Sequence, residues 1–542
     1  MVLDETTAAS SAAVTGDATF SSTGSAFSGM PLQSLIHRVR ETVAVVKNRS
    51  SGAIGLRLQG GSEDPDCVVT GVLPPLYPEW LGDRAFAEVH QTRFPYVVGE
   101  MAAGIATAQM VIEAARGGFL GFFGAAGLGL DRVERAISEI AGVLDVAPGK
   151  PWGSNLIHTP TELEMEDAVA DLYIRKDVRR ISASAFMSLT PSVARVAASG
   201  LRVDANGRIN RRRFIFAKIS RPETAAHFLS PPPSEMLDLL VSKGLITRQE
   251  ARLAARLPVA EDITVEADSG GHTDNRPLVC LLPVILDLRD RIAAKFDYAR
   301  PIRVGAAGGM GVPGSLAAAF SLGASYVMTG SVNQCAVEAG TSPAVKVMLA
   351  KADISDVMMA PAADMFELGV KVQVLKRGTM FAVRAGQLHR IYSEYSSLES
   401  IPAELRGQLE REIFRASFDD IWLDCERFWQ QRDPGQIAKA SRDERHRMAL
   451  VFRWYLGSAN RWATGGDAAR QLDYQIWCGP AMGAFNSWAG DSFLSDPANR
   501  GVVQIGLNLL EGAAVITRAH QARTYGVAVP SSAFSFRPRP LS

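Results

Sequence analysis

Cysteine is scarce in this chain, and what there is does not cluster. The 542 residues contain five cysteines, with no Cys-x-x-Cys pair and no histidine at zinc-ligand spacing: Cys67, Cys280, Cys335, Cys425 and Cys478. This scatter argues against a zinc site or a disulfide framework. We therefore interpret the five thiols as reduced core residues and predict no structural metal site.

Excess charge of either sign is also absent. Lys and Arg together number 57, and Asp and Glu also number 57. A protein that binds nucleic acid usually carries a strongly basic face, so neutrality argues against a nucleic-acid partner.

Long apolar runs are absent too, since the longest candidates are interrupted by Gly, Pro or charge. No stretch approaches the roughly 20 apolar residues that would span a bilayer. Residues 1–30 are rich in Ala, Ser, Thr and Gly but lack the basic start and continuous apolar run of a signal peptide. We predict a disordered tail over 1–30, no membrane partner and a cytoplasmic protein.

From Phe94 onward, β-branched and aromatic runs alternate with helical patterns, which is typical of repeated βα units around a parallel sheet. About eight strands are expected, the number that closes a TIM-type (β/α)₈ barrel. Their ranges are Pro95–Gly99, Phe119–Phe123, Trp152–Leu156, Ile181–Phe186, Phe214–Ile219, Ile263–Ala267, Ile302–Ala306 and Tyr326–Thr329. The fold class is thus α/β, with the barrel placed over residues 94–390.

The chain is longer than one barrel of roughly 250 residues, so additions are expected. A small amino-terminal module over 31–93 combines a helical pattern (Leu35–Val46) with a strand (Cys67–Leu73). Insertions are expected near 200–213 and 231–261, the second with helices at Ser234–Lys243 and Thr247–Arg256. Past Ala344 the alternation stops.

The residues after the barrel predict a further helical region. Strand-like pieces at Val370–Val374 and Met380–Ala385 precede a charged and aromatic helical pattern over Pro402–Trp462. We predict a helical subdomain over 391–495 that forms a lid over the substrate. A final helix is expected in Gly501–Arg523, within a segment 496–530 that packs back on the barrel.

Two glycine-rich loops follow the seventh and eighth strands, where such barrels often bind phosphate. The first is Gly305-Ala-Ala-Gly308-Gly309-Met-Gly311 and the second Thr329-Gly330-Ser331. Glycine lets the backbone come close to phosphate oxygens, and free N–H groups can donate to them. The two loops together predict a flavin or another phosphate-bearing ligand, held by Gly308, Gly309, Gly311, Thr329, Gly330 and Ser331.

The sixth strand runs into Ser269-Gly270-Gly271-His272. This sequence places an imidazole on a flexible turn at the barrel mouth, where a proton donor or hydrogen-bond donor for a substrate carbonyl would lie. We interpret His272 as the catalytic residue, with Gly270 and Gly271 beside the cofactor. The sequence does not say whether His272 would donate a proton or only a hydrogen bond.

These three segments resemble the nitronate monooxygenase and flavin-type enoyl reductase superfamily. The carboxyl-terminal text Phe485-Asn-Ser-Trp488-Ala-Gly-Asp-Ser-Phe493-Leu-Ser-Asp-Pro497-Ala-Asn499-Arg500, with Asn508-Leu-Leu-Glu-Gly512, narrows the resemblance to the PfaD family. PfaD proteins are trans-acting enoyl reductases of polyunsaturated fatty acid and polyketide synthases. The resemblance extends from about Leu32 to Val529.

The resemblance also implies residue roles. Gly99, Met101 and Ala102 are similar to a turn beneath the flavin ring, Asn155 to a flavin contact, and Lys218 with Ser220 to residues near the isoalloxazine. Family members often have Gly or Gln where this chain has Glu100. A structural and a functional role for that carboxylate therefore both stay open.

The implied reaction uses FMN and NAD(P)H. NAD(P)H would reduce FMN, and hydride would pass to the β-carbon of an enoyl thioester on an acyl carrier protein. The partners would be polyketide or fatty acid synthase modules, with a homodimer as the base-rate expectation. Acyl chain, preferred nicotinamide, partner synthase and oligomeric state are not fixed by the sequence.

Other interpretations of the same residues stay open. Trp454, Tyr455 and Trp462 could line a substrate tunnel or form the core of the added helices. The run Arg211-Arg212-Arg213 could meet an acidic carrier protein or be a solvated loop.

Three rival functions also stay open. They are a nitronate monooxygenase-like oxidase, a non-catalytic flavin-binding component of a megasynthase, and an FMN-dependent dehydrogenase of small hydroxy acids. The last would need a His and Arg arrangement that is not evident in the sequence.

Overall fold

The computed structural model describes residues 29–60, 64–146, 149–160 and 162–542. Its internal contacts divide the chain into two units. The smaller unit holds the described residues up to Leu76 together with Thr517–Ser535, and the larger holds Tyr77–Ile516 and Phe536–Ser542. The predicted tail over 1–30 lies almost entirely outside the described residues.

The larger unit is built on a closed parallel barrel, in the strand order β10-β11-β13-β14-β4-β5-β6-β7. Its strands are β4 (Tyr96–Val98), β5 (Leu120–Phe123), β6 (Trp152–Ile157), β7 (Arg180–Ser184), β10 (Phe214–Ile219), β11 (Asp262–Glu266), β13 (Arg303–Ala307) and β14 (Val327–Thr329). The predicted barrel is confirmed, with a strand at each expected place. Most of these strand residues are buried, because helices cover the outer face of the sheet.

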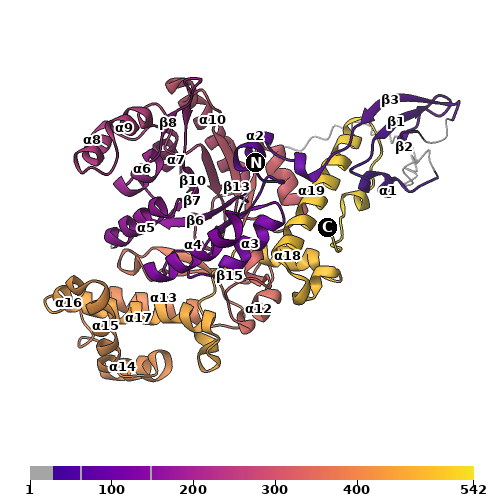
Figure 1. The fold of residues 1–542 in the computed structure, drawn as a ribbon. Helices are drawn as coiled ribbons and strands as arrows, with labels where there is room; N and C mark the ends of the chain where they lie inside the picture. The colour runs from indigo at the N-terminus through magenta and orange to yellow at the C-terminus, as the bar shows by residue number, and fades with distance from the viewer. Residues whose placement is uncertain (1–28, 61–63, 147–148, 161) are drawn as a thin grey trace, which may run out of the picture. The chain divides into compact units, whose positions relative to one another are not determined.

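The covering helices follow the strands in turn and surround the barrel (Figure 1). They are α3 (Ala108–Arg116), α4 (Leu130–Leu144), α5 (Leu163–Arg175), α6 (Pro191–Ala198), α7 (Pro222–Leu229), α10 (Leu278–Phe296) and α11 (Pro313–Ser321). Short loops join each strand end to its helix. Those loops gather at the carboxyl ends of the strands, the end at which barrels of this type carry their active sites.

The opposite end of the barrel is closed by helix α2 (Arg84–His90), which follows the short helix η1 (Pro78–Trp80). The ring of Phe86 stacks on Tyr326 with centroids 4.6 Å apart. The imidazole of His90 lies 3.1 Å from the carboxylate of Asp262, and Arg303 donates two hydrogen bonds to the same carboxylate at 2.7 and 2.8 Å. An aromatic and ionic plug therefore fills the amino-terminal end.

Two additions interrupt the βα repeat. A small hairpin of β8 (Arg202–Val203) and β9 (Ile209–Asn210) occupies the first predicted insertion, and helices α8 (Ser234–Ser242) and α9 (Arg248–Ala254) occupy the second. Helix α9 begins at a capping box between Thr247 and Glu250, which satisfies its first backbone N–H groups.

After the barrel, the alternation does not stop at Ala344 as the sequence suggested. Short helix η2 (Ser331–Cys335) leads to α12 (Pro343–Ala350), β15 (Val357–Pro361), η3 (Phe366–Leu368) and β16 (Lys371–Leu375). Strand β16 pairs with β15 on one side and with β12 (Gly271–His272) on the other. The expected strand at Met380–Ala385 is wrong. Those residues begin helix α13 (Phe381–Glu394), because Phe381, Ala385 and Leu388 repeat at helical spacing and are buried.

The predicted helical region is present and forms a group with its own core (Figure 1). It comprises α14 (Ala403–Leu409), a π-helical turn (Glu410–Phe414, η4), α15 (Phe418–Arg432), α16 (Pro434–Ala440), α17 (Glu444–Gly465) and η5 (Ala468–Asp473). Tyr455 is fully buried, and Trp454 and Trp462 pack against the same core. The core interpretation of these aromatics is therefore favoured over the tunnel.

The chain then returns along the barrel through α18 (Ala481–Ala489), η6 (Phe493–Ser495), η7 (Pro497–Asn499) and α19 (Val502–Thr524). A Cβ at Gly506 of α19 would lie 2.7 Å from the ring of Phe119, beside β5, so this part of the helix packs closely on the barrel. Helix α19 is the one described helix long and apolar enough to cross a membrane, and 72% of its apolar window is buried. Such burial is typical of a core helix.

The smaller unit contains α1 (Leu32–His37), η8 (Ser531–Phe534) and a sheet in the order β2-β1-β3. Its strands are β1 (Val43–Asn48), β2 (Ile54–Leu58) and β3 (Cys67–Leu73). The expected helix over Leu35–Val46 is wrong after His37. The run Val43-Ala-Val-Val is rich in β-branched residues, and it forms the central strand, paired on both sides.

Candidate active site

The loop after β4 is fixed against the end of β14. A Cβ at Gly99 would lie 2.8 Å from the side chain of Met328, so the close approach requires glycine. The N–H of Gly99 donates to the carbonyl of Thr329 at 2.9 Å. The hydroxyl groups of Thr329 and Tyr96 are 2.7 Å apart, so Thr329 has a structural partner rather than a free hydroxyl.

A row of charged side chains lies inside the barrel mouth. The ammonium group of Lys218, on β10, is 3.1 Å from Glu100 and 3.3 Å from Glu266. Ser182 donates to the carboxylate of Glu100 at 3.0 Å. Burial alone would lower the pKa of Lys218, but the two carboxylates outweigh it and hold the pKa above its usual value. Lys218 therefore stays a cation.

This arrangement gives Glu100 a clear structural role. It is buried with Lys218 as its ionic partner, and a buried charge needs such a partner. The sequence left a structural and a functional role open, and the ion pair favours the structural one. Glu266, which the sequence analysis did not select, completes the row.

Asn155 lies at the end of β6 and is also engaged by the scaffold. Its side-chain amide donates to the carbonyl of Ser182 at 3.0 Å and to the hydroxyl of Ser184 at 2.7 Å. Both N–H groups of Asn155 are therefore used to join β6 to β7.

The loop after β10 is tied to the loop after β11. Ser220 donates to Asp274 at 2.6 Å, and Arg221 binds the same carboxylate through two hydrogen bonds at 2.8 and 2.7 Å. The hydrogen bond from Arg221 lowers the pKa of Asp274 to about 2. Ser220 thus fixes a loop instead of pointing a free hydroxyl at a ligand.

His272 lies on strand β12, and not on the flexible turn that the sequence suggested. Residues 271 and 272 pair with Gln373 and Val372 of β16, and the side chain of Gln373 donates to Asp268 and to the carbonyl of Ser269, each at 2.7 Å. Strand pairing and side-chain hydrogen bonds therefore hold the glycine turn in place. The sequence analysis missed this because β16 lies about 100 residues later.

The imidazole of His272 has one ionic neighbour and an unused donor. Its Nε2 atom lies 3.3 Å from a carboxylate oxygen of Asp364. Nε2 is buried and has no hydrogen-bond partner among the described residues. Burial lowers the pKa of His272, but the carboxylates of Asp364 and Glu266 outweigh it, so the pKa is raised above its usual value. The site therefore favours an imidazole that can donate.

The two glycine loops leave space at specific positions. A Cβ at Gly309 or at Gly330 would meet no atom within 4 Å. Neither N–H donates to a backbone or side-chain acceptor elsewhere in the part of the chain that the structure describes. Gly308 and Gly309 have φ values of +82° and +71°, which favour glycine. Open space lined by free N–H groups fits a phosphate, so the residues present fit the phosphate group of FMN.

Other predicted cofactor residues serve a different purpose. A Cβ at Gly270 would lie 2.9 Å from the backbone of Cys478, and one at Gly311 would lie 2.2 Å from the carbonyl oxygen of Ala481. The hydroxyl of Ser331 accepts a hydrogen bond from the N–H of Gly479 at 3.1 Å. These three residues receive a later segment of the chain.

That segment is Trp477-Cys-Gly-Pro-Ala481, which we call the mouth strap. It contacts the loops after β11, β13 and β14, and the side chain of Gln334 donates to the carbonyl of Trp477 at 2.7 Å. The sequence analysis did not select it. Its Gly-Pro pair was the available signal, but its place depends on the whole helical group that precedes it.

Comparison with known proteins identifies the chain. The nitronate monooxygenase family matches residues 84–390, which is more than half of the chain. The crystal structure of the enoyl reductase domain of MlnA, from the macrolactin cluster of Bacillus amyloliquefaciens, is 40% identical with a TM-score of 0.78, and the match covers 82% of this chain and 99% of that domain. The chain belongs to the nitronate monooxygenase family, and within it to the PfaD-like enoyl reductases.

Curated relatives of this PfaD-like chain are parts of synthases. One polyunsaturated fatty acid synthase polypeptide of Thraustochytrium sp. is 45% identical over 451 residues, 82% of this chain and 30% of that protein. Polyketide biosynthesis protein PksE of Bacillus subtilis is 41% identical over 500 residues, 92% of this chain and 63% of that protein. The chain thus spans less than two thirds of either relative.

The helical group has a match of its own. Residues 395–474 match the inserted helical domain of [acyl-carrier-protein] S-malonyltransferase. This range begins just after α13 and ends with η5. The helices that follow the barrel therefore resemble a module found in proteins that act on acyl carrier proteins.

Proposed function

We propose that this chain is a trans-acting, FMN-dependent enoyl reductase whose substrate is an enoyl thioester carried on an acyl carrier protein. The observation that carries the proposal is the imidazole of His272, with a buried, unpartnered Nε2 at the mouth of a barrel whose two glycine loops fit a phosphate. The 40% identity to an enoyl reductase domain supports the choice of reaction.

When bound, FMN supplies the hydride for the β-carbon of the substrate, and NAD(P)H replenishes it. The backbone N–H groups of Gly309 and Gly330 hold the phosphate. Lys218, fixed between Glu100 and Glu266, keeps a positive charge beside the ring site. These residues bind and orient the cofactor.

His272 acts on the thioester. Its Nε2 donates to the carbonyl oxygen, where negative charge develops as hydride reaches the β-carbon, and a donor fixed in advance stabilises that charge. Asp364 positions the imidazole and favours its protonated form. His272 can therefore supply a hydrogen bond, a proton, or both in sequence.

The partners follow from the same proposal. We infer that synthase modules deliver the acyl carrier protein, as the names of the relatives suggest, and that the enzyme works in the cytoplasm as a homodimer. The helices over 395–474 are the part of the chain that would meet the carrier protein, since their matching module occurs in an acyl-carrier-protein transferase.

The test is an anaerobic assay on the purified protein. FMN-loaded protein, NAD(P)H and a crotonyl-loaded acyl carrier protein are mixed, and the acyl mass is followed. We expect a gain of about 2 Da that requires both FMN and reductant. Consumption of oxygen with a nitronate and no acyl saturation would instead indicate an oxidase.

Variants then test the role of His272. His272→Ala should retain FMN and lose roughly a hundredfold to a thousandfold in kcat, as removal of an oxyanion donor does. His227→Gln, an exposed histidine on α7, is the matched control and should keep full activity. Full activity in His272→Ala would overturn the proposed site.

The pH profile distinguishes proton donation from hydrogen bonding. Because the pKa of His272 is raised, a required imidazolium would persist at neutral pH and be lost as the pH rises through that value. A wild-type kcat that declines on the alkaline side, and a flat profile in His272→Gln, would assign proton transfer. Equal flat profiles would assign hydrogen bonding alone.

A further inference from the structure

A second recess lies at the opposite end of the barrel from the proposed active site. It has a volume of about 680 Å³ and is lined by the first residues of β7 and β10 together with the β8–β9 insertion. Six guanidinium groups line it, those of Arg179, Arg180, Arg202, Arg211, Arg212 and Arg213, and no carboxylate does. Such a wall is a strongly basic cavity.

The acidic partners of these arginines do not balance their charge. Asp177 is the ionic partner of Arg179, Arg212 and Arg213, and Glu261 is the partner of Arg211. Arg180 and Arg202 form no ion pair with any residue that the structure describes. Two carboxylates therefore pair with four of the six cations, and the cavity keeps a positive excess.

Arg180 shows the imbalance most clearly. Its side chain is buried, and it donates to the carbonyl of His90 at 2.9 Å and toward the His90 ring at 3.4 Å. Asp262 and Asp145 attract it only from a distance, and burial with the neighbouring charge of Arg179 lowers its pKa to about 10. A buried cation beside other cations is costly unless an anion joins it.

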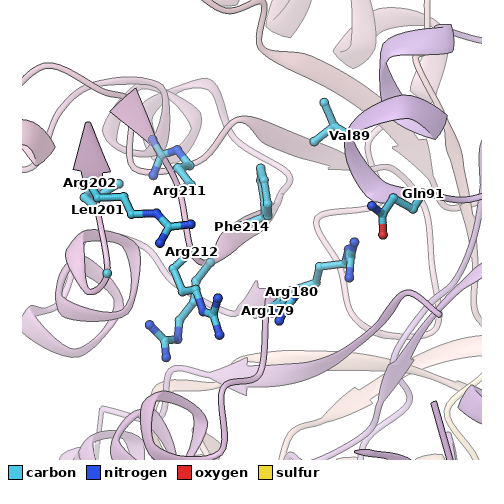
Figure 2. Close-up of a pocket in the computed structure, with 11 residues that line it drawn as sticks. Val89, Gln91, Arg179, Arg180, Leu201, Arg202, Arg211, Arg212 and Phe214 are labelled. Carbon is cyan, nitrogen blue, oxygen red and sulfur yellow. The ribbon is translucent and has the colours of Figure 1, made fainter. Parts of the chain in front are cut away.

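The remaining walls suggest the rest of the ligand. Figure 2 shows Arg202 and Arg211 on one side of the recess and Gln91 with Val89 on the other, with Phe214 between them. An aromatic ring, an apolar side chain and an amide are groups that can hold a ring and its polar edge. The recess also falls within the 300–1,000 Å³ typical of small-molecule sites.

The depth of the charges favours a small anion over a protein surface. Arg180 and Arg213 are 8% and 5% exposed, so acidic side chains on a flat partner could not reach them. Guanidinium groups bind phosphate oxygens with two parallel hydrogen bonds. A polyphosphate small enough to enter the recess satisfies several of them at once.

We propose that this recess is a binding site for a nucleotide-sized polyphosphate anion, separate from the flavin site. Strand β10 runs from Phe214 at the recess to Ile219 at the mouth, about 16 Å at 3.3 Å per residue. A ligand in the recess therefore cannot exchange hydride with the flavin. The aromatic plug of α2 lies between the two sites.

The test uses the FMN-loaded full chain and three probes, ADP, inorganic triphosphate and inorganic phosphate, each titrated by calorimetry. The tested protein carries Arg202→Gln and Arg179→Gln together, and both side chains are exposed, so the fold should persist. Arg291→Gln on α10, exposed and 3.0 Å from Asp287, is the matched control. Far-ultraviolet circular dichroism checks that each variant is folded.

We expect ADP and triphosphate to bind the wild type and the control equally, and the double variant to lose roughly tenfold or more in affinity, since each lost charged hydrogen bond costs about a factor of ten. ADP binding tighter than triphosphate would assign the ring to the Phe214 wall. No binding of any probe would overturn the proposal. Binding that the double variant does not weaken would also overturn it, as would binding of an acidic carrier protein alone.

Because the readout is binding, failure here leaves the enoyl reductase assay unaffected. A protein that saturates the acyl chain but binds no anion would retain the proposed function and lose this site. The opposite result would retain this site and lose the proposed function.

Discussion

At the scale of single residues, the glycines of the barrel mouth divide into two kinds. Gly309 and Gly330 face open space, whereas Gly270 and Gly311 touch the mouth strap at Cys478 and Ala481. The sequence predicted all four as cofactor residues, because a glycine beside a phosphate and a glycine beneath a backbone look alike in a sequence. Only the fold distinguishes them.

Gly330→Ala tests the phosphate assignment. Gly330 has a φ of −127°, so alanine is not excluded by a left-handed backbone, and its Cβ meets no atom within 4 Å. We expect unchanged stability but at least roughly tenfold weaker FMN binding, because the methyl group takes the place of a phosphate oxygen. Fluorescence titration of the apoprotein with FMN measures it.

Gly142→Ala is the control for this change. Gly142 lies inside helix α4, and its Cβ would also meet open space. Alanine there should raise stability by about 0.5–1 kcal/mol without altering FMN affinity. Equal FMN affinity in Gly330→Ala and the wild type would exclude a phosphate at that loop.

At the scale of elements, one buried carboxylate holds the helical group together. Asp473 is fully buried and binds Arg384 of α13, Tyr455 of α17 at 2.8 Å and Arg470 of η5 at 3.2 Å. Three segments that are far apart in sequence therefore share one anion. Removing its charge leaves two largely buried guanidinium groups without their partner.

Asp473→Asn should destabilise the helical group by roughly 3 kcal/mol, while the barrel keeps its protection. Hydrogen exchange followed by mass spectrometry would show faster exchange in peptides from α13 and α17 only. Asp419→Asn is the control, since Asp419 is 79% exposed beside Arg447 and should change stability by under about 1 kcal/mol. Uniform loss of protection in barrel peptides would contradict a separate core.

Element prediction succeeded where local pattern was enough. The barrel strands and the helices of the second insertion follow from alternation and periodicity, because each is decided by a few neighbouring residues. It failed at Val43–Val46 and at Met380–Ala385, where short apolar runs fit a helix and a strand equally. Partners distant in sequence decided both, β3 for the first and the core of the helical group for the second.

At the scale of the whole molecule, stability should depend on pH through paired carboxylates. The pKa of Asp274 is about 2 in the folded chain, below the value of about 3.9 expected when unfolded. A depressed folded pKa gives stability that is present above about pH 4 and is lost as the pH falls toward 2. Asp262 acts in the same direction, since His90 and Arg303 outweigh burial and lower its pKa.

Asp274→Asn therefore should cost about 1 kcal/mol at pH 7, after allowance for solvent screening of a partly exposed pair. The cost should shrink at about pH 4 and vanish near pH 2–3. Urea unfolding midpoints of wild type and variant at these pH values measure the difference. Asp287→Asn, 70% exposed on α10, is the control, and a cost that does not change with pH would contradict the linkage.

The site was predictable in part at this scale. The His272 turn and both glycine loops came from the sequence, because chemistry-bearing residues stand close to strand ends. Asp364, Glu266 and the mouth strap did not, since each depends on which distant segment the fold brings to the mouth. The run 211–213 was expected to face solvent or a carrier protein. In the structure its three arginines bind Glu261 and Asp177 and line the basic recess.

The mouth strap also sets an order of events during translation. Strand β14 ends at Thr329, whereas the strap begins at Trp477. At ribosomal rates of about 5–20 residues per second, the strap emerges roughly 10 to 30 s after the last barrel strand. During that interval a nascent chain can hold all its barrel strands with the loops around His272 still uncovered. Retention of the cofactor should therefore begin only when the last 65 or so residues are being made.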